Sequence, residues 1–183
     1  MDSRRADKHD RDKLARWHEG LTADPDYPFP VISLFLVASE DEDAHDVFRE
    51  FRASFEARGA GFEHSVIFGQ HGVSSTVEGL LARFGLSRSD LPLLALFSGP
   101  SAEVFHTLPL SGGPSVGRSE RVVPAAAGTE SGRVWQGVLG RLENAVDGGE
   151  TSLDPASLPE VTGLRLGNGP LVELVGQVLE QVS

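Results

Sequence analysis

The 183-residue sequence contains no cysteine. A chain without thiols has no disulfide framework, no thiolate nucleophile, and no ligand for an iron–sulfur cluster or a cysteine-bound zinc ion. Thiol–disulfide exchange is therefore excluded for this chain.

Long hydrophobic runs are also missing. The first 20 residues, MDSRRADKHDRDKLARWHEG, are densely charged and lack the apolar segment of a signal peptide. Elsewhere no apolar run approaches the roughly 20 residues that a membrane-spanning helix needs. We therefore expect a cytoplasmic protein without membrane contact.

Basic residues are few: 16 Lys and Arg stand against 27 Asp and Glu, which gives a net charge of −11. The first 30 residues are nearly balanced, with six basic and seven acidic side chains, so the remaining residues carry ten basic and twenty acidic ones. An acidic body repels phosphate backbones, which argues against nucleic acid as a partner and is compatible with a basic protein. The dinucleotide pattern G-x-G-x-x-G is absent, and we predict no cofactor.

The next feature is an alternation of apolar runs and helical patterns. Residues 31–38 (VISLFLVA) are continuously apolar, which predicts a central strand buried on both faces. Ser39 and Glu42 form a capping-box pattern, and an apolar stripe at helical spacing follows up to Gly59. The stripe consists of Val47, Phe48, Phe51 and Phe55.

A second strand and helix follow the first pair. Residues 62–68 (FEHSVIF) favour a strand, and Ser75 with Glu78 forms another capping-box pattern before a helix that ends at Gly85. Residues 91–97 (LPLLALF) predict a third strand with Pro92 at its entrance, and a turn at residues 98–101 leads into an antiparallel strand over residues 102–108.

The remaining residues are assigned to the two ends and a loop. Leu14 and Trp17 indicate a short N-terminal helix within residues 1–20, followed by a Pro-rich linker to residue 30. Residues 109–132 are predicted to be a long loop, residues 134–146 a helix, and residues 171–182 a last amphipathic helix after Pro170. We divide the chain into 1–30, 31–147 and 148–183. The last helix packs on its own domain or offers an interface to a second copy of the chain.

This order of elements resembles the thioredoxin-like fold. Residues 84–105 (FGLSRSDLPLLALFSGPSAEVF) resemble the segment in which a cis-proline begins the third core strand, and Pro92 matches that proline. The CxxC motif is missing, because its place is taken by residues 40–45 (EDEDAH). The resemblance implies an α/β fold with a β-α-β-α-β-β-α core, extended by N- and C-terminal helices, and a redox-inactive relative that serves in docking, chaperone-like or scaffolding roles.

A second resemblance is to response-regulator receiver domains, which also place acidic residues after the first strand, as in ASEDED here. The receiver's third strand ends in a phosphate-accepting aspartate, whereas Ala95 or Phe97 stands near that place. Receivers also continue with a helix where this sequence indicates a hairpin, so the thioredoxin-like order fits better.

The candidate binding site is the vestigial active-site edge that the resemblance implies, where two segments meet if Pro92 is cis. Its residues are Ser39, Glu40, Asp41, Glu42, Asp43, His45, Leu91 and Pro92. Carboxylates with one imidazole are ligand types for a divalent cation. Acidic residues in the first helical turn are, however, favoured by the helix dipole alone, so we predict no metal site.

The sequence leaves three hypotheses of function open. The first is a non-catalytic protein–protein interaction or scaffolding module. The second is a binder of a small, glutathione-like ligand, or a non-thiol enzyme, at the same edge. The third is an acidic inhibitor or immunity-type protein that neutralises a basic target.

Overall fold

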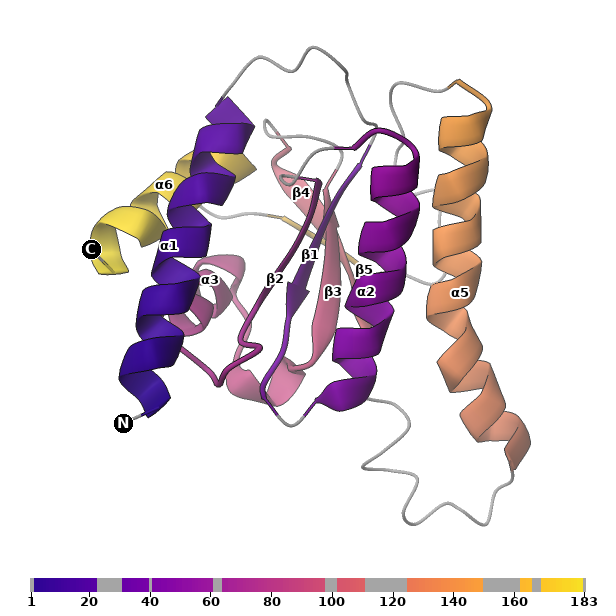
Figure 1. Cartoon of the computed structure of the whole chain (residues 1–183), viewed down its shortest axis with the longest axis horizontal. Coiled ribbons are helices and arrows are strands. Elements are labelled where there is room, and N and C mark those ends of the chain that lie inside the picture. Colours follow the sequence, from indigo (N-terminus) through magenta and orange to yellow (C-terminus); the bar gives the residue numbers. More distant parts are fainter. Residues whose placement is uncertain are drawn as a thin grey trace.

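The computed structural model describes residues 2–22, 31–39, 41–60, 64–97, 102–110, 125–149, 162–165 and 169–182. These residues form a mixed α/β fold with a helix at each end, as predicted (Figure 1). The elements are α1 (Asp2–Thr22), β1 (Ile32–Leu36), α2 (Glu42–Ala57), β2 (Ser65–Phe68), α3 (Ser75–Phe84), the 3-10 turn η2 (Arg88–Asp90), β3 (Leu93–Phe97), β4 (Val104–Pro109), α5 (Ala125–Asp147), β5 (Thr162–Arg165) and α6 (Leu171–Val182).

The described strands form one sheet in the order β2-β1-β3-β4-β5. β1 runs parallel to β2, and this pair is connected by α2, as a parallel connection requires. The pairs β1–β3, β3–β4 and β4–β5 are antiparallel. Every residue of β1, β2 and β3 is buried, which confirms that the apolar run at residues 31–38 contains a strand covered on both faces.

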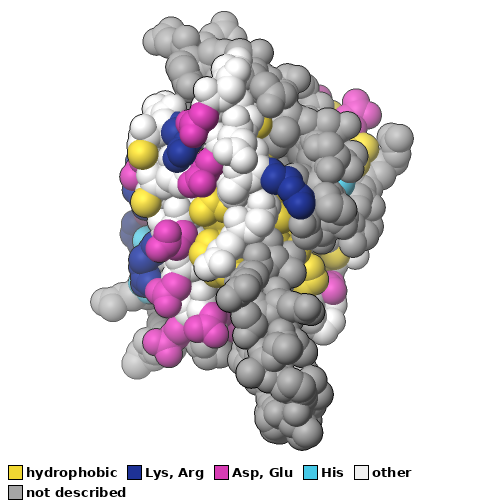
Figure 2. Space-filling model, turned by 90° about the vertical axis from the view of Figure 1, so that its right-hand side faces the viewer, with side chains coloured by type: hydrophobic (Ala, Val, Ile, Leu, Met, Phe, Trp, Pro, Cys, Tyr) yellow, Lys and Arg dark blue, Asp and Glu magenta, His cyan; other side chains and the backbone are white. Residues whose placement is uncertain are grey.

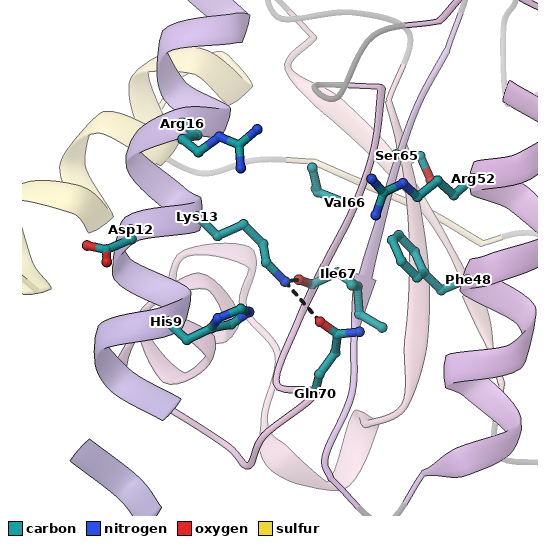
Figure 3. Close-up of a pocket in the computed structure, with 10 residues that line it drawn as sticks. All are labelled: His9, Asp12, Lys13, Arg16, Phe48, Arg52, Ser65, Val66, Ile67 and Gln70. Carbon is teal, nitrogen blue, oxygen red and sulfur yellow. Dashed lines mark hydrogen bonds between the residues drawn. The ribbon is translucent and has the colours of Figure 1, made fainter. Parts of the chain in front are cut away.

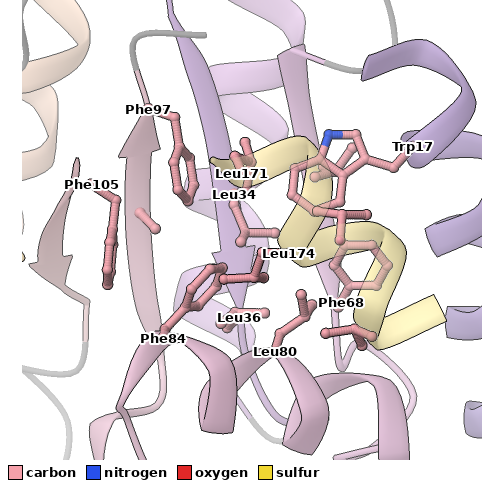
Figure 4. Packing of buried hydrophobic residues seen from close by; sticks show 14 of the residues in the cluster. Trp17, Leu34, Leu36, Phe68, Leu80, Phe84, Phe97, Phe105, Leu171 and Leu174 are labelled. Carbon is pink, nitrogen blue, oxygen red and sulfur yellow. The ribbon is translucent and has the colours of Figure 1, made fainter. Parts of the chain in front are cut away.

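Successive side chains of β1 divide the core into two clusters on opposite faces of the sheet. Leu34 and Leu36 lie on the first face, which α1, α3 and α6 cover (Figure 1). Phe35 lies on the second face, which α2 and α5 cover. Figure 4 shows the first face, where Trp17 of α1 and Leu174 of α6 lie near the aromatic rings of the strands and of α3.

Both ends of the chain contribute to the first face. Leu14 and Trp17 of α1 are fully buried, and so are Leu171, Leu174, Val175 and Val178 of α6. Glycine permits close helix contacts here: a Cβ built on Gly79 would lie 3.0 Å from Val178 Cγ1, and one on Gly176 would lie 3.0 Å from His18 Nε2. The apolar stripe of the last helix thus packs on its own chain.

The starts of two helices differ from the prediction. The Ser39–Glu42 capping box is wrong, because Asp41 is the N-cap of α2 and Glu42 its first residue. Helix α3 is capped by Ser74 instead of the predicted Ser75. Ser74 Oγ accepts a hydrogen bond from Val77 N at 3.2 Å. In each case the last residue before the helix takes the cap position, which spacing alone does not identify.

The region after the hairpin also differs. The predicted loop over residues 109–132 is wrong at both ends, since Pro109 closes β4 and α5 begins at Ala125. Three consecutive alanines, which have the highest helix propensity, outweigh the Gly and Ser content there. β5 was not predicted, because four residues (TGLR) carry too short a pattern for a strand. The linker at 23–30, the turn at 98–101 and residues 111–124 lie outside the described residues.

None of the described helices is long and apolar enough to cross a membrane. The longest, α5 with 23 residues and α1 with 21, both contain charged side chains along their length. This finding agrees with the lack of long apolar runs in the sequence.

Candidate functional site

The predicted site residues lie at one end of the sheet. Leu36 of β1 is paired with Leu93 of β3, so the register places Val37 beside Pro92 just beyond the two strands. The Leu91–Pro92 peptide bond is cis, as the resemblance implies. We call the region made by Ser39, Asp41, Glu42, Asp43, His45, Leu91 and Pro92 the acidic edge. Within it Pro92 is buried and does not reach the surface. Glu40 lies outside the described residues.

Two members of the acidic edge bind the backbone of the turn between β1 and α2. Asp41 Oδ2 accepts a hydrogen bond from Ala38 N at 2.8 Å, and His45 Nε2 lies 3.1 Å from Ala38 O. Because a carbonyl oxygen only accepts, the His45 Nε2 atom must carry the proton in this contact. Asp41 and His45 therefore fix the turn that precedes α2.

Two other members are exposed to solvent. Glu42 and Asp43 occupy the first turn of α2, where the helix dipole favours negative charge. Neither side chain makes a hydrogen bond or an ion pair with any described residue, whereas Asp46, one turn further on, pairs with Arg49. Figure 2 views the side of α2 and α5 and shows Asp and Glu side chains gathered in its lower part, at the height where α2 begins in Figure 1.

The acidic edge does not assemble a metal centre from described residues. In the part of the chain that the structure covers, no group of three or more His, Asp or Glu side chains is arranged to hold an ion. The carboxylates of Glu42 and Asp43 are accounted for by their place at a helix N-terminus.

A second candidate site, which the sequence did not predict, lies between α1, α2 and the edge strand β2. It is a pocket with a volume of about 360 Å³ (Figure 3). Its lining residues are His9, Asp12, Lys13 and Arg16 of α1, Phe48 and Arg52 of α2, and Ser65, Val66, Ile67 and Gln70 of β2 and the turn after it. We call it the cationic pocket.

Several contacts fix Lys13 in this pocket. Its Nζ atom donates hydrogen bonds to Ile67 O at 2.5 Å and to Gln70 Oε1 at 3.1 Å, and lies 5.5 Å from the centre of the Phe68 ring. Burial, together with the positive charges of Arg52 and Arg16, lowers the pKa of Lys13 to about 8, although the attraction of Asp10 acts in the opposite direction. The lysine is thus a partly desolvated amine held in one orientation.

The other titratable groups leave the pocket positive. Asp12 is the acidic member of the lining, but its carboxylate is bonded to Lys8 at 2.8 Å, and Figure 3 shows it directed away from the pocket. Burial lowers the pKa of His9, and the charges of Lys13 and His71 lower it further. The His9 and His71 rings meet edge to face with centroids 4.6 Å apart.

A buried carboxylate fastens α1 next to the pocket. Asp10 is 1% exposed, and its Oδ2 atom accepts hydrogen bonds from Gly69 N at 3.0 Å and from Ser74 Oγ at 2.7 Å. Burial raises the pKa of Asp10, although these hydrogen bonds act in the opposite direction. Since Ser74 also caps α3, one carboxylate connects α1, the end of β2 and the start of α3.

The sequence contains part of the signal for the cationic pocket. His9, Lys13 and Arg16 stand at positions i, i+4 and i+7, which is one face of a helix, beside the face that buries Leu14 and Trp17. Nothing in the sequence indicates that this face lies opposite Arg52 of α2. The cluster depends on how α1 docks, and local patterns do not encode that.

Comparisons with family models, with curated proteins and with solved structures find no match to this chain. The functional inference therefore depends on the residues of the chain itself.

Proposed function

We propose that the protein is a non-catalytic interaction module of thioredoxin-like architecture that binds a basic protein partner through the acidic edge. The observation that carries this proposal is the pair Glu42 and Asp43: both carboxylates are exposed, adjacent and unpaired within the described residues. Half-buried Leu91 lies at the same end of the sheet, beside cis-linked Pro92, which is itself buried. Unpaired, exposed carboxylates are suited to Lys and Arg side chains of a partner.

The thioredoxin-like part of the proposal is supported by the order of the elements. From β1 to α5 the order is β1-α2-β2-α3-β3-β4-α5, with α2 and α5 on one face of the sheet and α3 on the other. A receiver domain has a parallel sheet in the strand order 2-1-3-4-5. Here β3 runs antiparallel to β1 and forms a hairpin-like pair with β4, which favours the thioredoxin-like alternative.

The hydrogen bonds at the acidic edge favour binding over catalysis. Asp41 and His45 are the groups there that are best suited to acid–base chemistry, and both are bonded to the backbone of Ala38. The carboxylates of Glu42 and Asp43 are exposed to solvent and free of such hydrogen bonds to the described backbone. They can steer and bind a cationic surface, and the net charge of −11 adds to that attraction at a distance.

The test is affinity purification of the tagged protein from the cells that make it, at about 50 mM and at about 500 mM salt, with mass spectrometry of the bound proteins. We expect a basic partner in near-stoichiometric amount at low salt and much less of it at high salt. Failure to recover any stoichiometric partner at low salt would contradict the proposal.

Charge reversal then locates the binding surface. The double variant Glu42→Lys with Asp43→Lys should weaken binding of the recovered partner at least about tenfold in calorimetry, because two charge-assisted contacts become repulsive. Glu50→Lys with Glu180→Lys is the matched control, since both residues are exposed, lie outside the acidic edge and give the same change in net charge. Equal loss of affinity in the two double variants would show that net charge, and not the acidic edge, attracts the partner.

A further inference from the structure

The cationic pocket places like charges together in a protein that is acidic as a whole. Lys13, Arg16 and Arg52 line one cavity of about 360 Å³, and the charges of both arginines lower the pKa of Lys13. Like charges around one cavity repel one another, and an anion bound between them would relieve that repulsion. In a chain with a net charge of −11, a cavity lined by three cationic side chains is a candidate binding site for an anion.

The cations converge from two helices. Figure 3 shows the Arg16 guanidinium directed from α1 and the Arg52 guanidinium directed from α2 toward the same stretch of β2, with the Lys13 ammonium below them. Lys13 Nζ has three N–H groups, of which two are used by Ile67 and Gln70. Arg52 is about half exposed, and its Nε atom donates to Glu56 at 3.1 Å. Hydrogen bonds to described residues do not involve its terminal Nη atoms.

Two apolar side chains also line the pocket. The Phe48 ring of α2 and the Val66 side chain of β2 line it next to the cations, and Figure 3 shows the ring pointing toward the strand. A cavity of this volume is larger than one inorganic anion needs and falls within the range of sites for small organic ligands. The lining thus combines cationic groups with a small apolar area, where Phe48 is 5% and Val66 1% exposed.

We propose that this pocket binds a small organic phosphate monoester, with the phosphate between Lys13, Arg16 and Arg52 and the organic group against Phe48 and Val66. A phosphate monoester is largely a dianion at neutral pH and offers three acceptor oxygens to three cations. Guanidinium groups match phosphate oxygens with paired N–H donors, whereas a carboxylate would bring one charge only. The site is separate from the acidic edge and does not depend on the function proposed for it.

Binding should depend on pH through Lys13, whose pKa of about 8 leaves it charged below that pH and neutral above it. The groups near it are Asp10, His9 and Arg16 on α1, Arg52 on α2 and Gln70 in the turn after β2, and His71 lies against His9. A bound dianion favours the charged ammonium, so complex formation takes up protons near pH 8. The affinity should fall as the pH rises from 7 to 9.

The test is calorimetric titration of the full chain with phenyl phosphate, inorganic phosphate and benzoate. We expect phenyl phosphate to bind at least about tenfold more tightly than either of the others, since only it offers both a dianion and an apolar group. Arg52→Gln should weaken phenyl phosphate binding about tenfold or more. Arg49→Gln is the matched control and should change the affinity less than about twofold, because Arg49 lies on the same helix, also pairs with a carboxylate, and does not line the pocket.

Three results would overturn the proposal. One is the absence of phenyl phosphate binding to the wild-type chain. Another is equal loss of affinity in Arg52→Gln and Arg49→Gln, which would show attraction by overall charge. The third is benzoate or inorganic phosphate binding as tightly as phenyl phosphate, which would exclude the organic phosphate class. Arg52 is used for the test because it is a surface residue, whereas a substitution of Lys13 would also remove the hydrogen bond to Ile67 O of β2.

Discussion

The two faces of the sheet are held together in different ways. On the first face, α1 and α6 come from the two ends of the chain and bury Trp17 and Leu174 against the strands. The second face is covered by α2 and α5, and polar bonds join these helices at their surface: Ser54 Oγ donates to Glu143 at 2.6 Å, and Arg58 Nε donates to Asp147 at 3.0 Å. On the first face, by contrast, the carboxylate that fastens α1 is buried.

This contrast shows that the contribution of a polar interaction to the free energy of unfolding depends on whether the interaction is buried. The Arg58–Asp147 pair is largely exposed on the Asp147 side, and exposed pairs contribute at most about 1 kcal/mol to the free energy of unfolding. A buried carboxylate with two buried donors is different, because removing it leaves those donors without partners. We therefore expect the first face to be more sensitive to polar substitutions than the second.

The largest effect should come from the apolar anchor of α1. Trp17→Ala removes a fully buried ring from the first face and should lower the free energy of unfolding by about 3–5 kcal/mol, measured by urea denaturation. Phe51→Ala is the matched change on the second face, where the ring is equally buried. A loss below about 1 kcal/mol for Trp17→Ala beside a full loss for Phe51→Ala would mean that α1 is not part of the cooperative core.

The next largest loss of stability should come from removing the buried carboxylate of Asp10. Asp10→Ala should lower the free energy of unfolding by about 2–3 kcal/mol, because Gly69 N and Ser74 Oγ lose their acceptor in a buried place. Asp12→Ala is the control on the same helix, and its exposed side chain should leave the melting temperature almost unchanged. Equal effects of the two substitutions would contradict a special role for the buried link.

The same residue makes the first face sensitive to pH. Burial raises the pKa of Asp10, so the folded chain binds this proton more tightly than the unfolded chain. Its contribution to stability is then full below about pH 4 and is lost as the pH rises through the folded pKa. Asp10→Asn lacks this dependence. Its stability relative to the wild type should increase from pH 3.5 to pH 7, and a constant difference would show that the pKa of Asp10 is not raised.

The fold could be predicted where the pattern is local. Residues 31–38 and 91–97 are continuous apolar runs, and residues 47–55 repeat at helical spacing, so β1, β3 and α2 were correct apart from their ends. The sequence does not indicate the fifth strand, because four residues are too few to show a period. It indicates a loop at the start of α5, because the Gly and Ser around Ala125 mask the helix propensity of the three alanines.

The two candidate sites also differ in whether a local sequence pattern reveals them. The acidic edge could be proposed because residues 39–45 are consecutive and Pro92 begins a recognisable strand. The cationic pocket needs Lys13 of α1 and Arg52 of α2 beside β2, and these residues approach only when α1 docks on the finished sheet. Asp10 was missed for the same reason, since its partners Gly69 and Ser74 follow much later in the chain.

The smallest effects should have opposite signs on the two faces. Gly79→Ala places a methyl group 3.0 Å from Val178 Cγ1, and Val178 is fully buried and cannot move aside, so the variant should be about 1 kcal/mol less stable. Gly140→Ala in α5 meets nothing within 4 Å and should be about 0.5–1 kcal/mol more stable, since alanine favours the helix. Thermal denaturation of both variants measures the signs. Stabilisation by both would mean that α3 and α6 can separate slightly, and that the first face tolerates more adjustment than its close helix contact indicates.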